Sequence, residues 1–363
     1  MVGIGNTAIT ILEFILAFGV LIFLHEFGHF IVARLNHIEV EEFGIGYPPK
    51  ICKLFRFAGT DFTLNWIPFG GFCRMKGESG DVKEPGSFTS ASPWRRFFTL
   101  LGGPMMNLLL GMVLIAFLII RIGVADTGKV VITSVDANSP AATANLQVGD
   151  IIEQINNQPV QGLDSLSTLI KANLGVPTTL TLLRGSETVA VSLVPRENPP
   201  AGHGSMGVSV SNPSKPVSAV QAIPAAFTAT IDQGVQLIMI PVKLISGQIA
   251  PSSARLVSVK GLYDIFSQVK TEDAQAAATT PADAGMNILY FIAVLSIALG
   301  YTNLLPIPAL DGGRILFILP ELLFHKKVPQ QLENRVHMIG YSLLMILMVV
   351  LIINDIINPV VIH

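Results

Sequence analysis

Charged residues are scarce in this sequence. Only 13% of its 363 residues are Asp, Glu, Lys or Arg, and 50% are hydrophobic, whereas soluble domains carry roughly a quarter of charged residues. The 23 basic and 25 acidic residues leave a net charge of -2, so no long-range field of one sign would recruit nucleic acid. The composition therefore argues against a soluble or nucleic-acid-binding protein and indicates an integral protein of a lipid bilayer.

Cysteine is also rare, with Cys52 and Cys73 as the only two. They do not form a Cys-x-x-Cys pair, and we place both in a cytoplasmic loop, where thiols stay reduced. No Lys or Arg precedes the first hydrophobic stretch, and no Ala-x-Ala cleavage pattern ends it. We therefore interpret this stretch as a retained membrane helix rather than a signal peptide.

Four apolar stretches reach the roughly 20 residues that cross the hydrocarbon core as a helix. They are 8–35, 99–120, 286–305 and 337–357. A shorter apolar run, 315–324, follows a proline-rich break after the third stretch. Segment 223–245 is apolar too, but three polar side chains and Pro241 interrupt it. We predict an amphipathic surface helix there; if it spanned, the later helices would invert.

Basic residues are concentrated in two short loops. The loop at 34–97 carries nine of the 23, namely Arg34, Lys50, Lys53, Arg56, Arg74, Lys76, Lys83, Arg95 and Arg96. The loop after the third span adds four, namely Arg314, Lys326, Lys327 and Arg335. Short basic loops face the cytoplasm. Both termini and the long middle region are therefore expected outside.

The middle region changes character at about residue 127. Alternating strand-like runs with turns between them, such as Val130–Thr133, predict a soluble β-rich domain over 127–196. Within it, 131–160 resembles a PDZ domain of the bacterial protease-associated kind. PDZ domains bind peptides by adding a strand to a sheet edge. The resemblance implies either a peptide partner or a rigid plug that filters substrates by size.

A linker and amphipathic helix are predicted for 197–285, where Pro and Gly are frequent after Pro195 and where 274–284 reads as a flexible tether. The complete prediction is a polytopic α-helical membrane protein with about four spans and one inserted domain. Its segments are a first span 1–36, a cytoplasmic-side loop 37–97, a second span 98–122, the β-rich domain 127–196, the linker 197–285, a third span 286–325 and a fourth span 336–358.

The first span contains His25-Glu26-Phe27-Gly28-His29. Residues four apart lie on one helical face about a turn apart, so two imidazoles can hold one cation. Glu26 can then contact a metal-bound water, as in His-Glu-x-x-His metalloproteases. Ionisable side chains inside a span are costly and mark function. The alternative is a helix end solvated at the membrane interface.

A catalytic zinc usually takes three protein ligands and a water, so a third ligand must come from elsewhere. We predict Asp311, which follows two helix-breaking prolines and precedes two glycines in the segment 303–313. The first and third spans run in the same direction, and His25 lies roughly 25 Å along its span. Asp311 is expected at a similar depth. The alternative is an ordinary surface Asp at a helix exit.

These motifs together resemble the bacterial site-2 protease family, in its regulator-of-sigma-E protease branch. The resemblance implies zinc ligands at His25, His29 and Asp311, a catalytic Glu26 and a substrate-positioning Asn303. It also implies that Pro68-Phe69-Gly70-Gly71-Phe72 belongs to a membrane-associated β-hairpin loop and that Gly103-Pro104-Met105-Met106-Asn107 is the second-span signature. A strand edge for the substrate is thus expected at Phe69, Gly70 and Gly71. The alternative for the glycines is a plain tight turn, and the alternative for Asn303 is a helix cap.

The resemblance also implies a function. The expected substrate is a pre-trimmed single-span membrane protein, such as an anti-sigma factor or a remnant signal peptide. The expected location is the bacterial inner membrane, with the PDZ domain on the outer side and the active site near the cytoplasm. Only one PDZ domain fits here, although better-known members have two, and 255–261 matches the family loosely. A membrane-anchored PDZ adaptor with a vestigial metal site and a metal transporter are the competing interpretations.

Overall fold

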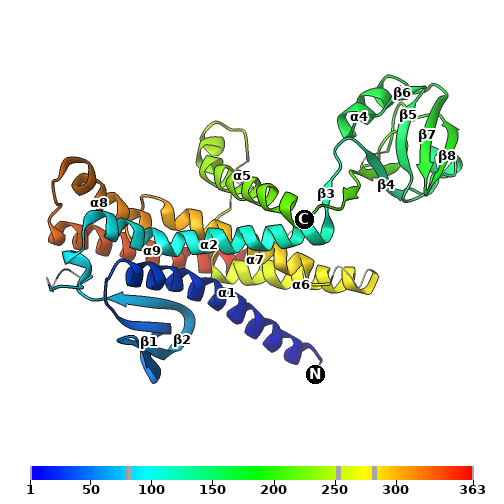
Figure 1. Cartoon of the computed structure of the whole chain (residues 1–363). Helices are drawn as coiled ribbons and strands as arrows, with labels where there is room; N and C mark the ends of the chain where they lie inside the picture. Colours follow the sequence, from blue (N-terminus) through cyan, green and yellow to red (C-terminus); the bar gives the residue numbers. More distant parts are fainter. Residues whose placement is uncertain are drawn as a thin grey trace. The chain divides into compact units, whose positions relative to one another are not determined.

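The computed structural model describes residues 2–78, 80, 84–200, 202–250, 255–279 and 284–361. The chain forms two compact units, one built from 1–118 together with 220–363 and the other from 119–219 (Figure 1). We call the first the helical unit and the second the inserted unit.

Long helices dominate the helical unit. They are α1 (Val2–Leu35), α2 (Pro93–Ile122), α5 (Ala219–Ile245), α6 (Val259–Thr279), α7 (Met286–Leu304), α8 (Asp311–Phe324) and α9 (Gln330–Ile357), with the short 3-10 helix η1 (Phe88–Ser90) before α2. Five of these are long and apolar enough to cross a membrane, namely α1, α2, α5, α7 and α9. The expected break in the third span is present, because α7 ends at Leu304 and α8 begins at Asp311.

Two helices cover parts of the predicted linker and amphipathic helix at 197–285. Helix α5 covers the segment expected to be amphipathic, yet its length and composition place it among the five candidate spans. Most of the expected tether at 274–284 is helical, since α6 continues to Thr279, and alanine, which is abundant there, is the strongest helix former. Of the remaining tether residues, 280–283 lie outside the described residues, and 284 is in a turn.

Small residues let the helices of this unit approach closely. A Cβ added at Gly28 of α1 would lie 2.3 Å from the carbonyl oxygen of Gly102 in α2. Similarly, a Cβ at Gly111 of α2 would lie 2.3 Å from Ile297 of α7. Such contacts are typical of helices packed in membranes, where backbones come together without a large hydrophobic gain.

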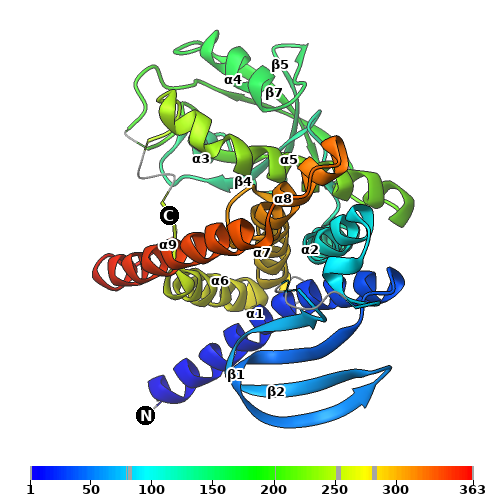
Figure 2. The ribbon, with the colours of Figure 1, turned by 90° about the vertical axis from the view of Figure 1, so that its left-hand side faces the viewer.

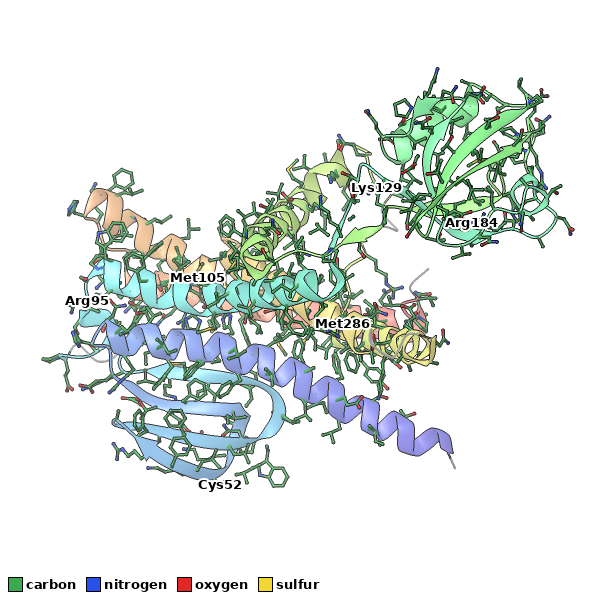
Figure 3. All side chains as sticks on the ribbon, turned by 45° about the vertical axis from the view of Figure 1, so that its right-hand side comes forward. Cys52, Arg95, Met105, Lys129, Arg184 and Met286 are labelled. Atoms are coloured by element: carbon green, nitrogen blue, oxygen red, sulfur yellow. The ribbon has the colours of Figure 1, made fainter. Side chains whose placement is uncertain are left out.

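A β-sheet packs against α1, as expected for the loop after the first span. Its strands are β1 (Val40–Phe57) and β2 (Thr60–Met75). Both strands bend, so that Gly44 pairs with Phe72 and also with Thr63. Buried side chains from the sheet and α1, including Phe30 and Phe43, form a common core. Strands β1 and β2 lie beside α1 (Figure 2). The two thiols are free: Cys73 is buried, and Cys52 is exposed on the part of the sheet away from α1 (Figure 3).

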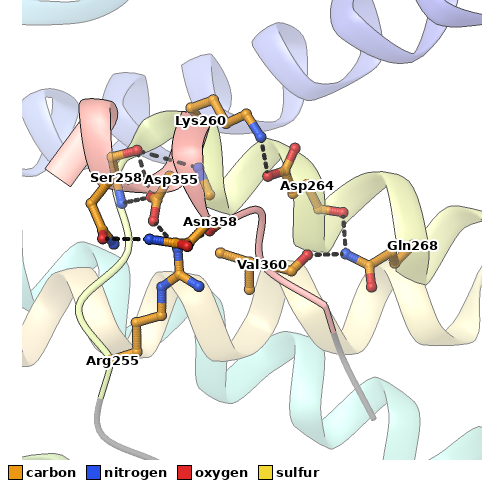
Figure 4. Close-up of polar contacts among 10 residues, drawn as sticks. Arg255, Ser258, Lys260, Asp264, Gln268, Asp355, Asn358 and Val360 are labelled. Atoms are coloured by element: carbon orange, nitrogen blue, oxygen red, sulfur yellow. Dashed lines mark hydrogen bonds and ion pairs between the residues drawn. The ribbon is translucent and has the colours of Figure 1, made fainter. Parts of the chain in front are cut away.

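Helices α6 and α9 are joined by a buried polar cluster (Figure 4). Asp355 of α9 is 0% exposed and accepts hydrogen bonds from the N–H and hydroxyl of Ser258, both at 2.7 Å. Arg255 donates to the other carboxylate oxygen at 2.6 Å. A Cβ at Gly261 would lie 2.5 Å from Asp355. The cluster therefore fixes the beginning of α6 against the end of α9.

The inserted unit is a β-rich fold. Its six-stranded sheet has the order β8-β7-β5-β4-β9, with β6 paired to β5, and a separate pair joins β3 and β10. The elements are β3 (Val124–Ala125), β4 (Val130–Val135), α3 (Pro140–Thr143), β5 (Ile151–Ile155), β6 (Gln158–Pro159), α4 (Leu163–Lys171), β7 (Thr178–Arg184), β8 (Glu187–Leu193), β9 (Val208–Ser211) and β10 (Ser214–Lys215). The unit extends past the predicted limit at 196 because β9 pairs with β4.

Candidate metal centre

Three potential ligand atoms meet between α1 and the start of α8. The Nε2 atoms of His25 and His29 lie 3.3 Å apart. One carboxylate oxygen of Asp311, Oδ2, lies 3.1 Å from the first and 3.3 Å from the second. Both imidazoles are buried. The structure thus brings together the three residues that the sequence predicts as ligands.

The spacing of these atoms suits zinc. Two ligand atoms about 2.0–2.1 Å from a common ion, at a tetrahedral angle, lie roughly 3.3 Å apart. The three observed separations, 3.1, 3.3 and 3.3 Å, match that value. Two imidazole nitrogens and one carboxylate oxygen also form the donor set of many catalytic zinc sites. The residues therefore fit a zinc ion with a fourth position left for water.

Helix α2 fixes the orientation of His29. The ring donates from Nδ1 to the carbonyl oxygen of Thr99 at 2.8 Å, which places the lone pair of Nε2 toward the other ligands. A Cβ added at Gly103 would lie 2.3 Å from Nε2 of His29. Any larger residue at position 103 would therefore push this ring out of the site.

Asn107 lies one turn further along α2 and contacts His25. It is buried, and its amide nitrogen lies 3.3 Å from Nδ1 of His25, while its oxygen has no partner among the described residues. An imidazole whose Nε2 faces a metal carries its proton on Nδ1 and needs an acceptor there. Rotating the Asn107 amide by 180° supplies that acceptor. Asn107 is therefore placed to hold His25 with Nε2 directed toward the other two ligand atoms.

The break between α7 and α8 places Asp311. Gly312 and Gly313 pack against carbonyl groups of the break, since a Cβ at either position would lie 2.3 Å from the oxygens of Leu304 and Ile307 respectively. Glycine is needed because backbone approaches backbone here. Asp311 is therefore the first residue of a helix that starts directly beside the two imidazoles.

A cavity of about 610 Å³ opens beside the three ligands. Its lining includes Glu26, Asn303 and Gly71, all predicted from the sequence. Gly70 lies next to Gly71 in β2 and has φ +107, but it is not among the described residues that line the cavity. Phe69 lies within β2, and its side chain is outside the described part of the structure. The segment from Gly71 to Met75 forms one wall.

Other residues of this cavity were missed by the sequence prediction. Tyr47 lies on the wall, and its ring occupies the space next to Gly70, where a Cβ would be 2.1 Å away. Arg314 and Glu78 form an ion pair at the cavity. Arg314 follows Asp311 by three residues, so helical spacing alone could have placed it near the site. The sequence prediction included Asn107 only as the last residue of the second-span signature and gave it no contact with His25.

This chain is similar in sequence to one known family and to several known proteins. A model of peptidase family M50 matches residues 13–347. A Clostridium acetobutylicum protein, whose name assigns it provisionally to the zinc metalloproteases, is 33% identical over 350 residues, covering 95% of this chain and 97% of the relative. The regulator of sigma-W protease RasP of Bacillus subtilis is 28% identical over 429 aligned residues, covering 96% and 98%. The zinc metalloprotease RasP of Bacillus licheniformis is 30% identical over 431.

Proposed function

This chain belongs to peptidase family M50 and is a zinc metalloprotease, and from that premise we propose that it cleaves a single-span membrane protein within or near its transmembrane segment. The observation that carries the proposal is the convergence of His25, His29 and Asp311 beside a cavity lined by Glu26. All three ligands belong to a unit with five apolar helices of membrane-spanning length.

Each residue has a role in this proposal. Zinc, held by the two imidazoles and Asp311, would polarise the scissile carbonyl and lower the pKa of a water molecule. The Glu26 carboxylate takes a proton from the attacking water and passes it to the departing amine. Asn303, which lines the cavity, donates its amide to the substrate backbone.

The β-sheet supplies a place for an unwound substrate. A transmembrane helix hides its carbonyl groups in internal hydrogen bonds, so it must be extended before water can attack. Residues 71–75 pair with 40–45 on one side and line the cavity. A substrate strand added to this edge would satisfy its own backbone groups and lie beside Glu26, since a Cβ at Gly71 would be 3.5 Å from the Glu26 side chain.

The arrangement of helices supports four spans rather than five. Helix α7 runs antiparallel to α2, because Gly300 lies against Leu108 while Ile297 lies against Gly111, and so it runs parallel to α1. Between the end of α2 and the start of α7 the chain must then cross the membrane an even number of times. Helix α5 is the one candidate span in that stretch of the described chain. We therefore retain α5 as a surface helix.

With the basic loops inside, we propose that the ligands lie toward the cytoplasmic side of a bacterial inner membrane and that the inserted unit lies on the outer side. The inserted unit would act as a PDZ domain that binds a peptide or limits substrate size. One relative is named a regulator of sigma-W protease. We accordingly propose a substrate of the anti-sigma-factor or remnant-signal-peptide class, already trimmed on its outer side.

The test uses purified full-length protein in detergent with a model single-span substrate. Glu26→Gln should lower cleavage by about 10²–10⁴-fold, because it removes the general base. Glu41→Gln, which changes an exposed glutamate of β1 in the same chemical way, should cleave as the parent does. Equal cleavage by parent and Glu26→Gln would refute the protease proposal and favour a membrane-anchored PDZ adaptor. Zinc flux through the protein in liposomes would instead favour a transporter.

A further inference from the structure

The chain makes a tight turn immediately before Asp311. The N–H of Leu310 donates to the carbonyl oxygen of Ile307 at 3.1 Å, which closes a four-residue turn with Pro308 and Ala309 at its centre. Ala309 has φ +80. Proline at the second position and a positive φ at the third are the features of a type II turn.

Alanine is an unfavourable residue at this third position. A type II turn places glycine or asparagine there, because a Cβ clashes with the backbone when φ is positive. Strained residues of this kind persist only when their surroundings hold them, and they cluster at functional sites. Ala309 is two residues from Asp311 and lines the cavity. Some contact must therefore hold the turn.

His337 of α9 provides that contact. Its Nδ1 accepts the backbone N–H of Ala309 at 2.9 Å. The ring must then carry its proton on Nε2, an atom that is buried and has no partner among the described residues. A polar group buried without a partner is costly, so Nε2 does not help to hold the ring in place. The ring is held by the hydrogen bond from Ala309 to Nδ1 and by packing against Phe317, whose ring centre is 5.4 Å away.

The backbone of α9 also touches the turn. A Cβ added at Gly340 would lie 2.4 Å from Cβ of Pro308. Gly340 is one helical turn beyond His337, so both residues meet the turn from one face of α9. The last long helix thus contacts two consecutive residues of the turn, Pro308 and Ala309.

We infer that His337 is a positioning residue of the metal centre: by accepting the Ala309 N–H, it holds the strained turn in the form that aims Asp311 at His25 and His29. The inference rests on the proposed role of Asp311 as a metal ligand. It assigns to α9 a part in zinc retention, although α9 contributes no ligand to the described cluster.

The experiment measures the release of zinc from the loaded full-length protein into an excess of a chromogenic chelator. His337→Leu keeps a side chain of similar bulk but has no acceptor, and it should release zinc about 10- to 100-fold faster, as when other partners of ligands are lost. His337→Asn can place Oδ1 where Nδ1 was and should stay within about threefold of the parent. With substrate, His337→Leu should lower kcat with KM little changed.

A second substitution separates positioning from general destabilisation. Ala309→Gly removes the steric cost of the positive φ, so in the His337→Leu background it should restore most of the slow zinc release. If His337→Leu alone yields too little folded protein, recovery of yield by Ala309→Gly counts in the same way. Parental zinc release from His337→Leu, no advantage of His337→Asn over it, or no recovery by Ala309→Gly would each overturn the inference.

Glu26→Gln keeps this test distinct from that of the protease proposal. This variant should lose cleavage but release zinc at the parental rate, because Glu26 is not one of the three clustered ligands. Failure of the protease proposal would appear as cleavage by Glu26→Gln. Failure of the present inference would appear in the zinc-release rates alone.

Discussion

Asp311 and Asp355 are two aspartates of the helical unit whose surroundings are opposite in kind. Asp355 accepts from Ser258 and pairs with Arg255, so the chain itself supplies the donors and the opposite charge. Asp311 faces the Nε2 atoms of His25 and His29. The Nδ1 atoms of these rings face Asn107 and Thr99, respectively. The lone pairs at the Asp311 site converge on one point.

The groups that surround a buried carboxylate distinguish a metal site from a structural ion pair. Burying a carboxylate is expensive unless it is paired and hydrogen-bonded. Asp355 meets that requirement with an arginine and a serine, whereas Asp311 lies against two imidazole nitrogens, which are ligands that a shared cation can bridge to the carboxylate. Substitutions at the two sites should therefore have different consequences, with zinc binding affected at one and helix packing at the other.

The largest effect is expected from Asp311→Asn. The substitution keeps the shape of the side chain but removes the negative charge that zinc requires, so zinc affinity should fall by more than about 100-fold and cleavage should fall to background. Zinc content after dialysis and cleavage of the model substrate are the measurements. Asp355→Asn, the matched control, should retain stoichiometric zinc; loss of zinc from both variants would erase the contrast.

A smaller effect on zinc is expected from Asn107→Leu. It removes the acceptor for Nδ1 of His25, and loss of such a partner typically costs 10- to 100-fold in metal affinity or activity. Competition with a chelator of known affinity measures it. Asn107→Asp keeps an oxygen at that position and should bind zinc at least as tightly as the parent; weaker binding by Asn107→Asp than by Asn107→Leu would contradict the hydrogen bond.

Asp355→Asn should act on packing. Weakening the bonds to Arg255 and Ser258 loosens the joint between α6 and α9, so backbone amides in the first turn of α6 should exchange with deuterium about tenfold faster. Mass spectrometry of peptides from 255–265 reports this in the whole protein. Unchanged exchange there, together with lost zinc, would show that the cluster serves the metal centre instead.

The smallest effect concerns the inserted unit, where Asp150 is paired as Asp355 is. Arg184 donates to both carboxylate oxygens, at 2.8 and 2.7 Å, and Gln147 donates its N–H at 2.9 Å. The hydrogen bonds from Arg184 lower the pKa of Asp150 below its ordinary value near 3.8, against the opposing effect of burial. The stability it contributes is therefore present above pH 3.8 and is lost as pH falls through the lowered pKa.

Deuterium exchange of β5 and β7, corrected for intrinsic exchange rates, measures this contribution. Protection should be unchanged from pH 7 to about pH 5 and should decline below about pH 4. Asp150→Asn should begin with lower protection and show a smaller decline. An equal acid-induced decline in both proteins would mean that other carboxylates dominate.

Some of this structure could be predicted because it depends on local patterns. Long apolar runs specify spanning helices by length alone, and His-x-x-x-His places two ligands on one helical face wherever the helix lies. Prolines and glycines around Asp311 similarly mark a helix break. Alternation in 127–196 predicted strands, but β9 was missed because its four residues follow a Pro/Gly-rich stretch that reads as a linker.

Local sequence patterns were therefore enough to predict the membrane helices, the pair of histidines, the broken helix before Asp311 and the inserted β-rich unit. Tertiary structure decided which groups from distant segments complete the site: Thr99 and Asn107 behind the imidazoles, residues 71–75 along the cavity and His337 beneath the turn at Ala309. The physical reason is that periodicity fixes the face of a helix on which a residue lies, whereas the neighbour across that face depends on how closely the backbones pack.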